Sequence, residues 1–154
     1  DTCFMSMYAA LDALPADLRA AIEGKSLNHD SSHDSAGKLR SNHSAFDNVS
    51  VAPGARHPMI RAHPETGRPA IFLGRRLHAW VVGENIANSE ALLDRIWDHC
   101  IDEAFTYRHR WQPGDLLMWD NRCTMHRRDP FDAGARRVMH RTQLKGYQSV
   151  EAAA

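Results

Sequence analysis

The polar and apolar positions in the first part of the chain predict two short helices and then a long loop. Residues 5–13 and 16–23 are expected to be helical, with a break at Pro15, which disfavours helix in the residue before it and can open the next helix. Gly24 is a natural helix end. Residues 28–56 are polar and show no period, so we expect a long loop. Loops of this length inside a domain are usually lids or binding segments.

The middle of the chain predicts short strands and one strong helix. Residues 57–64 and 68–74 are strand candidates on either side of a Pro-Glu-Thr-Gly turn, and residues 77–83 are another. Residues 89–101 place their apolar side chains on one helical face, with Asn88 or Ser89 as the expected cap. That face consists of Leu92, Leu93, Ile96, Trp97, Cys100 and Ile101.

The last third predicts four strands in close succession, which favours an antiparallel sheet with a few helices outside it. These strands are expected at residues 105–111, 115–121, 122–128 and 136–144, with a Pro113-Gly114 turn after the first. A chain of 154 residues is long enough for one modest domain, and we expect residues 1–154 to belong to a single, mainly β domain.

Composition excludes some partners. Lys+Arg and Asp+Glu both number 19, so nothing favours a nucleic-acid binder that neutralises phosphates or a protein that binds membrane surfaces. No apolar run is long enough for a transmembrane helix. The 3 cysteines are widely spaced, which predicts reduced thiols in a cytoplasmic protein. Because the chain opens on Asp1 without a methionine, we expect it to continue a longer protein.

The segment 111–146 contains the most informative chemistry. If residues 136–144 form one strand, Arg137 and Arg141 share a face, because strand side chains alternate with a period of two. Inward-facing arginines are costly unless an anion meets them, so a buried anionic ligand is the natural explanation. His126, on the preceding predicted strand, suggests a metal that the anion also binds.

This segment resembles the C-terminal signature of the taurine dioxygenase / 2,4-dichlorophenoxyacetate dioxygenase family. The matching pattern is W-D-N-R-x-x-x-H, then an arginine eleven residues on and another four later. The stretches HPMIRAHPETGRPAIFLG, FTYRHRWQPGDLLMWDN and DTCFMSMYAALDALPADLRAAIEG also resemble the family. The resemblance covers nearly the whole chain and is weakest at residues 28–56.

The resemblance implies a double-stranded β-helix, a jelly-roll-like fold that here lacks its N-terminal strands. It implies Fe(II) held by two histidines and a carboxylate, with 2-oxoglutarate and O₂ as co-substrates. His126 matches an iron ligand, Arg137 and Thr2 match the residues that hold the far carboxylate of 2-oxoglutarate, and Arg141 matches the arginine expected to meet the acidic group of the substrate. Trp119 resembles a tryptophan that lines the site.

The family's His-x-Asp motif, which supplies the other two iron ligands, is absent from this chain. The pairs at 29–30 and 33–34 are adjacent His-Asp and do not replace it. We therefore expect that the chain alone holds iron poorly and exposes strand edges. Asp120 and Asn121 are expected to form a turn, and His63 is expected to be structural.

The function implied is hydroxylation of a small organic acid, such as a sulfonate or an aryloxyalkanoate, with release of succinate and CO₂. Family members often assemble, which suggests a homo-oligomer. Two alternatives stay open: a non-catalytic anion-binding β-sandwich, and a cupin-like metal isomerase or hydrolase. The first predicts no His-x-Asp in the full protein, and the second predicts further inward histidines without paired arginines.

Overall fold

The computed structural model describes residues 1–34, 37–74, 77–132, 134, 136 and 138–144. Within these ranges eight short strands outnumber three α-helices, in agreement with the mainly β architecture expected from the sequence. The strands are β1 (Thr2–Ser6), β2 (Ser26–Asp30), β3 (Gly54–Pro58), β4 (Ile60–Ala62), β5 (Pro69–Ile71), β6 (Trp80–Val81), β7 (Thr106–His109) and β8 (Thr124–Arg128). The helices are α1 (Met7–Asp12), α2 (Ala16–Ile22) and α3 (Ile86–Cys100), with 3-10 turns at Val49–Val51 and Glu103–Phe105.

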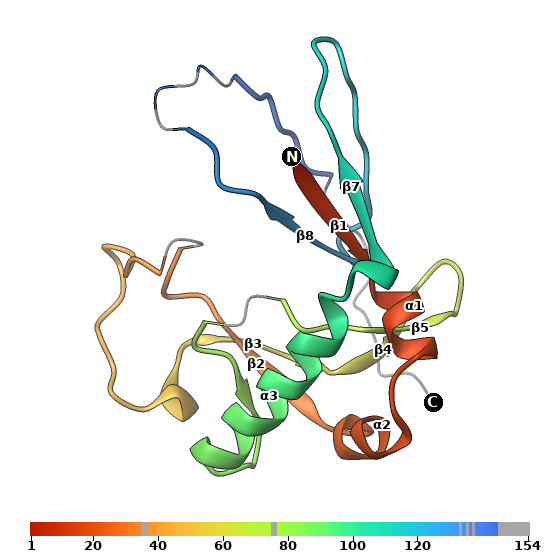
Figure 1. The fold of residues 1–154 in the computed structure, drawn as a ribbon. Helices are drawn as coiled ribbons and strands as arrows, with labels where there is room; N and C mark the ends of the chain where they lie inside the picture. Colours follow the sequence, from red (N-terminus) through yellow and green to blue (C-terminus); the bar gives the residue numbers. More distant parts are fainter. Residues whose placement is uncertain (35–36, 75–76, 133, 135, 137, 145–154) are drawn as a thin grey trace.

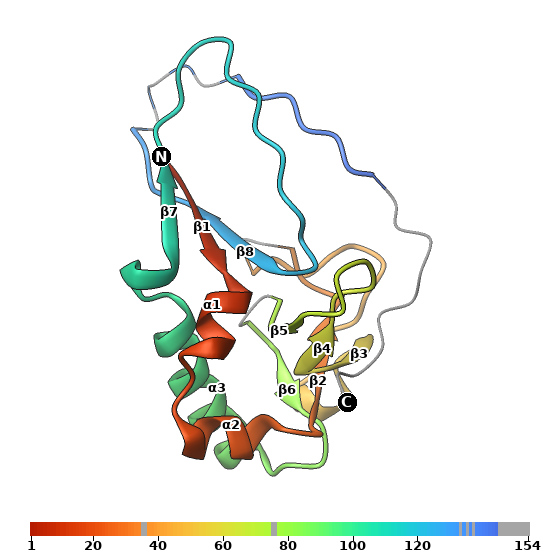
Figure 2. The same cartoon turned by 90° about the vertical axis from the view of Figure 1, so that its right-hand side faces the viewer.

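The strands form three antiparallel sheets with the orders β7-β1-β8, β3-β2-β6 and β4-β5. We call β7-β1-β8 the open sheet. The β3-β2-β6 and β4-β5 sheets, which we call the small sheets, form the body together with the three helices, with the helices on one side and the small sheets on the other (Figures 1 and 2). The arms are residues 110–123 and the described part of 129–144, which extend from the open sheet at the top of Figure 1.

The body owes its stability to one apolar core. Leu93 and Ile96 on α3 are fully buried and belong to one cluster with Leu11 of α1 and Ile71 of β5. Burying a side chain of this size contributes roughly 1.5–3 kcal/mol. No helix in the described ranges has the length and apolar composition needed to cross a membrane.

The β4–β5 hairpin, β6, β7, β8 and the helix after residue 85 confirm predictions from the sequence. The helix begins earlier than expected, because Asn85 caps it: its side chain accepts from the backbone N of Asn88 at 2.8 Å. The expected caps Asn88 and Ser89 lie inside the helix. Ile101 lies beyond the helix end and is exposed, although the sequence placed it on the buried face.

Two boundaries in the first third were wrong. Residues 5 and 6 belong to β1 and not to a helix, because β1 is paired on both edges and those backbone bonds outweigh local helix propensity. Ser6 then caps α1 by accepting from the backbone N of Ala9. The loop expected at 28–56 is shorter, because both of its ends pair with each other as β2 and β3. Buried polar side chains such as Asn28 interrupt the alternation of polar and apolar residues that would have indicated a strand.

Two predicted strands are not formed. Residues 115–121 have no strand, and Leu116 and Met118 are 92% and 84% exposed. Residues 136 and 138–144 also have none. A strand needs a partner to satisfy its backbone groups, and neither segment is paired with another in the described part of the chain. The 3 cysteines are free thiols, as expected.

Candidate active site

The two faces of the open sheet have different surroundings. Cys3 and Met5 of β1 point into the apolar core, so Thr2 and Phe4 point to the opposite face, because strand side chains alternate. The register with β8 places Phe4 directly across from His126. Directly opposed residues lie on one face of a sheet, so this register brings His126 to the same face as Thr2.

An aromatic group marks this face. The Trp119 ring lies 5.0 Å from the centroids of both Phe4 and His126, and the Phe4 and His126 rings are stacked at 6.1 Å. The Arg141 guanidinium carbon lies 5.6 Å from the centroid of the Trp119 ring. Trp119, His126 and Arg141, which the sequence singled out separately, therefore gather in one place.

His126 is exposed, so its imidazole is accessible and can serve as a metal ligand. Its burial against neighbouring rings, and then the charge of Arg141, hold the pKa of His126 below its ordinary value. The neutral imidazole that results is the form that binds metals. Among the residues described, no group of three histidine, cysteine or carboxylate side chains includes His126, so this part of the chain does not contain the set of three ligands that the expected iron site would need.

Thr2 lies near one end of the same face and is buried. Its hydroxyl oxygen accepts a hydrogen bond from the indole nitrogen of Trp111 at 2.9 Å. A hydroxyl has one donor in addition to its acceptor sites, so Thr2 can still donate to a carboxylate oxygen. Trp111 was not among the site residues expected from the sequence, and its ring makes a T-shaped contact with His109. The paired register of β1 and β7 brings His109 opposite Thr2.

The arginine pair is only partly visible. Arg137 lies outside the described residues, so its place relative to Thr2 stays a prediction. The described residues 138–144 form no strand, and both Met139 and Arg141 are exposed, so the strand face expected beneath Arg141 is not formed. Arg141 reaches the site through its contact with Trp119 instead.

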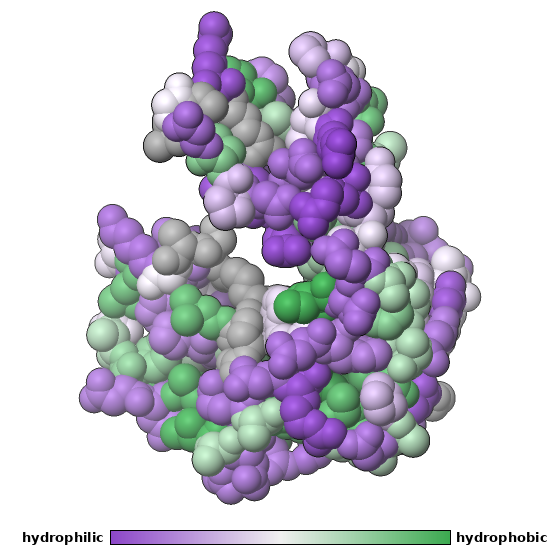
Figure 3. Space-filling model, in the orientation of Figure 1, coloured by the Kyte–Doolittle hydropathy of each residue, from purple (hydrophilic) through white to green (hydrophobic). Residues whose placement is uncertain are grey.

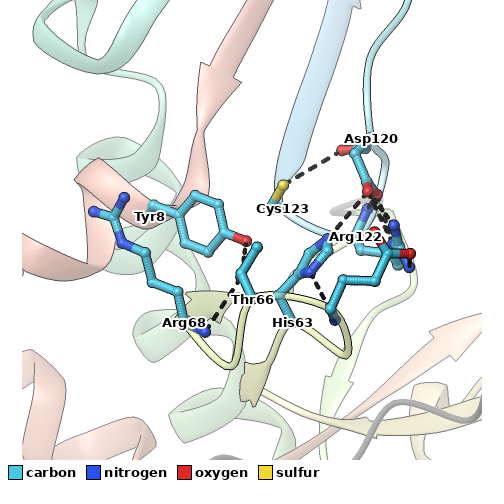
Figure 4. A network of polar contacts seen from close by, with 8 residues as sticks. Tyr8, His63, Thr66, Arg68, Asp120, Arg122 and Cys123 are labelled. Carbon is cyan, nitrogen blue, oxygen red and sulfur yellow. Dashed lines mark hydrogen bonds and ion pairs between the residues drawn. The ribbon is translucent and has the colours of Figure 1, made fainter.

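A polar network lies beside this site and joins the β4–β5 hairpin to the turn before β8 (Figure 4). His63 Nε2 lies 3.1 Å from a carboxylate oxygen of Asp120, and Arg122 binds the same carboxylate through its Nε at 2.9 Å to both oxygens. These hydrogen bonds from Arg122 are the main reason that the pKa of Asp120 lies far below its ordinary value. The turn expected at Asp120 is confirmed, because the Arg122 backbone N donates to its side chain at 2.8 Å.

The chain is similar to a family of dioxygenases. The family model described as "Taurine catabolism dioxygenase TauD, TfdA family" matches residues 1–143. An "(S)-phenoxypropionate/alpha-ketoglutarate-dioxygenase" of Delftia acidovorans is 36% identical over 157 residues, covering 99% of this chain and 53% of the relative. An "Alpha-ketoglutarate-dependent 2,4-dichlorophenoxyacetate dioxygenase" of Cupriavidus pinatubonensis is 38% identical, covering 92% of this chain and 48% of that relative.

A solved structure shows the same likeness in three dimensions. The crystal structure of AAD-2 in complex with Mn(II) and N-oxalylglycine superposes with a TM-score of 0.72 at 30% identity, covering 88% of this chain and 53% of that protein. The chain thus spans about half the length of the relatives it matches. The family match covers most of the chain, and the fold agrees with it. The chain belongs to the TauD, TfdA family of dioxygenases.

Proposed function

We propose that this chain is the C-terminal part of a single domain that acts as an Fe(II)- and 2-oxoglutarate-dependent dioxygenase. Its substrate is a small organic acid of the aryloxyalkanoate or sulfonate type. The observation that carries the proposal is the convergence of His126, Trp119 and Arg141 on the face of the open sheet that also bears Thr2. The names of the relatives, which include a phenoxypropionate and a dichlorophenoxyacetate dioxygenase, support this substrate class.

Each side chain has a proposed task. His126 is one ligand of Fe(II), and Thr2 with Arg137 holds the distal carboxylate of 2-oxoglutarate. Bound iron, 2-oxoglutarate and O₂ supply the oxidising chemistry when they are present. Arg141 binds the acidic group of the substrate, and its planar guanidinium suits a carboxylate or a sulfonate. Phe4 and Trp119 limit water around His126, since both rings pack against its imidazole.

The chain alone is proposed to be inactive, because one imidazole is too few ligands for catalytic iron. The complete domain, in which this chain is joined to the half that its relatives have in addition, is proposed to supply the other two. We expect a cytoplasmic enzyme that assembles as a homo-oligomer and acts on small molecules, without a nucleic-acid or membrane partner.

The experiment is an assay of succinate release by the complete domain. Purified protein is mixed with Fe(II), 2-oxoglutarate and O₂, together with a panel of aryloxyalkanoates and alkylsulfonates. We expect succinate to form with at least one acid and to disappear in His126→Ala. Arg141→Ala should raise the KM for that acid roughly 10- to 100-fold, the loss expected for a hydrogen bond to a charged group.

Arg95→Ala is the matched control, because Arg95 is an exposed arginine on α3 whose ion pair with Asp17 lies in the body. It should leave the KM unchanged. If the complete domain releases no succinate with any acid of the panel, the proposed activity is wrong. Turnover that needs the metal but not 2-oxoglutarate would point to the isomerase or hydrolase alternative.

A further inference from the structure

Two polar contacts connect the turn that precedes β8, residues 120–123, to the β4–β5 hairpin. His63, directly after β4, contacts the Asp120 carboxylate at 3.1 Å, and Glu65 in the hairpin turn pairs with Arg122 at 3.0 Å. The side chain of His63 is 6% exposed and that of Asp120 is 34% exposed, so the first contact is partly shielded from water, whereas the second lies on the surface. A shielded contact between charged and polar groups is worth more than an exposed one.

The hydrogen bonds of His63 fix which ring nitrogen carries the proton. The backbone N of Glu65 donates to Nδ1 at 3.3 Å, so Nδ1 is the acceptor and Nε2 carries the hydrogen in the neutral ring. Nε2 therefore donates to Asp120. Both ring nitrogens are used, which holds the imidazole of His63 in one orientation.

The cluster of His63, Asp120 and Cys123 is better explained as a contact between the hairpin and the turn than as a separate metal site. Ligand atoms of His63, Asp120 and Cys123 lie within 4.8 Å of one another, a spacing that a cation could bridge. The Asp120 carboxylate, however, already accepts from the Arg122 Nε through both of its oxygens. A cation there would have to displace a guanidinium that neutralises the only carboxylate of the group.

The turn is directly connected to a residue of the candidate iron site. Trp119 comes just before Asp120, and its indole nitrogen donates to Asn121 at 2.9 Å within the same turn. Its ring then packs against His126 at 5.0 Å. At the other end of the turn, the Cys123 carbonyl accepts from the backbone N of Met7 at 3.0 Å, where β8 begins. A shift of the turn therefore moves the Trp119 ring against the His126 ring.

We propose that His63 is a positioning residue for His126, acting through Asp120 and the turn that carries Trp119. The inference rests on the proposed function, because it assumes that His126 binds the metal. It goes beyond that function by assigning a role to a histidine of another hairpin that touches neither His126 nor, in the proposal, the substrate.

The test compares two amide substitutions in the complete domain. The longer side chain of His63→Gln places a donor near the position of Nε2 and keeps the contact with Asp120. The shorter one of His63→Asn reaches only the position of Nδ1, so it keeps the Glu65 contact and loses Asp120. We expect His63→Asn to raise the Mn(II) dissociation constant about 10-fold or more, as for partners of metal ligands, and His63→Gln to stay within about 3-fold of wild type.

His99→Asn is the matched control, because His99 Nε2 donates to the Ala10 carbonyl at 2.8 Å in the body, away from the turn. It should lower the urea unfolding midpoint without changing Mn(II) affinity at temperatures where every variant is folded. The His126 ring signals in NMR spectra of the metal-free proteins give a second readout. They should shift in His63→Asn and stay in place in His63→Gln and His99→Asn.

The outcomes separate this inference from the proposed function. If wild type and His126→Ala bind Mn(II) equally well, the proposed function fails. If His126→Ala loses the metal while His63→Asn binds it as well as His99→Asn does, with unmoved His126 signals, His63 is structural only. Equal losses of metal affinity in His63→Asn and His63→Gln would also overturn the inference, because the contact with Asp120 would then not be what matters.

Discussion

The body buries its large apolar side chains, whereas the arms expose side chains of the same kind. In the body, Leu93 and Ile71 are fully buried, and one apolar cluster joins three helices to the small sheets. In the arms, Leu116 and Leu144 are 92% and 94% exposed, although they are chemically the same as the buried leucines. Figure 3 shows the outer ends of the arms at the top of the molecule, above the body. Other large apolar side chains of the arms are also exposed, namely Met118, Phe131, Val138 and Met139. Large exposed apolar patches usually mark a surface that interacts with another molecule or segment.

The candidate site lies where the two regions meet. Cys3 and Met5 anchor β1 in the core of the body, while Phe4 and Thr2 of the same strand face the side that bears Trp119 and the arms. The difference teaches that the candidate site lies on a strand whose opposite face is anchored in a packed core. Since the chain spans about half of its relatives, we expect the residues they have in addition to complete the site.

The largest difference between the two regions in their effect on the free energy of unfolding should come from replacing one leucine in each with alanine. Leu93→Ala should destabilise the chain by about 3 kcal/mol, within the range of 2–5 kcal/mol for buried leucines, because it leaves a cavity in the core. Leu116→Ala should change stability by less than about 0.5 kcal/mol, since its side chain is exposed. Urea unfolding of both variants measures this. Equal losses would mean that the arms are packed as tightly as the body.

Acidification should weaken the body by a comparable amount. Burial, and then the charges of His57 and Arg61, lower the pKa of His29 to about 4. In the unfolded chain this pKa is about 6.5, so below pH 6.5 the unfolded state binds a proton that the native state refuses. Stability should therefore fall as the pH drops from about 6.5 to about 4, by up to about 3 kcal/mol from His29 alone.

His29→Asn checks this assignment. It should flatten the curve of stability against pH in that window, whereas the carboxylate of Asp120, whose pKa lies well below its ordinary value, matters only at more acidic pH. A curve that keeps its full slope between pH 6.5 and 4 in His29→Asn would show that other groups cause the loss.

The smallest effect concerns the start of α3. Asn85→Ala removes the side chain that accepts from the Asn88 backbone N and should lower stability by about 1 kcal/mol. Asn88→Ala is the control, because Asn88 lies inside the helix, where alanine is the better helix former. The thermal midpoints of the two variants should move in opposite directions. If Asn88→Ala lowers the thermal midpoint more than Asn85→Ala does, Asn88 caps the helix, as expected from the sequence.

The body shows how far sequence patterns reach. The helical face with Leu93 and Ile96 was predictable, because a buried face imposes its period on the sequence. Met5 and Ser6 were assigned to a helix, because pairing with β7 and β8 is a long-range effect that a local window cannot contain. Leu116 and Met118 suggested a strand through their apolar pattern, but a strand also depends on a partner, and those residues have none within the described chain.

The site was predictable only as far as its motif. The W-D-N-R-x-x-x-H spacing led to Trp119 and His126, and the structure brings both rings together. The role of His63 could not be foreseen, because it lies 57 residues before its partner Asp120 and no local pattern links them. The same holds for Trp111, whose bond to Thr2 spans 109 residues.

The central claim is that His126, on the open sheet, binds the metal. The most direct measurement is a crystal structure of the complete domain with Mn(II) and N-oxalylglycine, the ligands named for AAD-2. We expect the metal within bonding distance of the His126 imidazole, N-oxalylglycine reaching toward Thr2 and Arg137, and His63 still bound to Asp120. Metal held instead by His63, Asp120 and Cys123, with His126 facing solvent, would contradict the account.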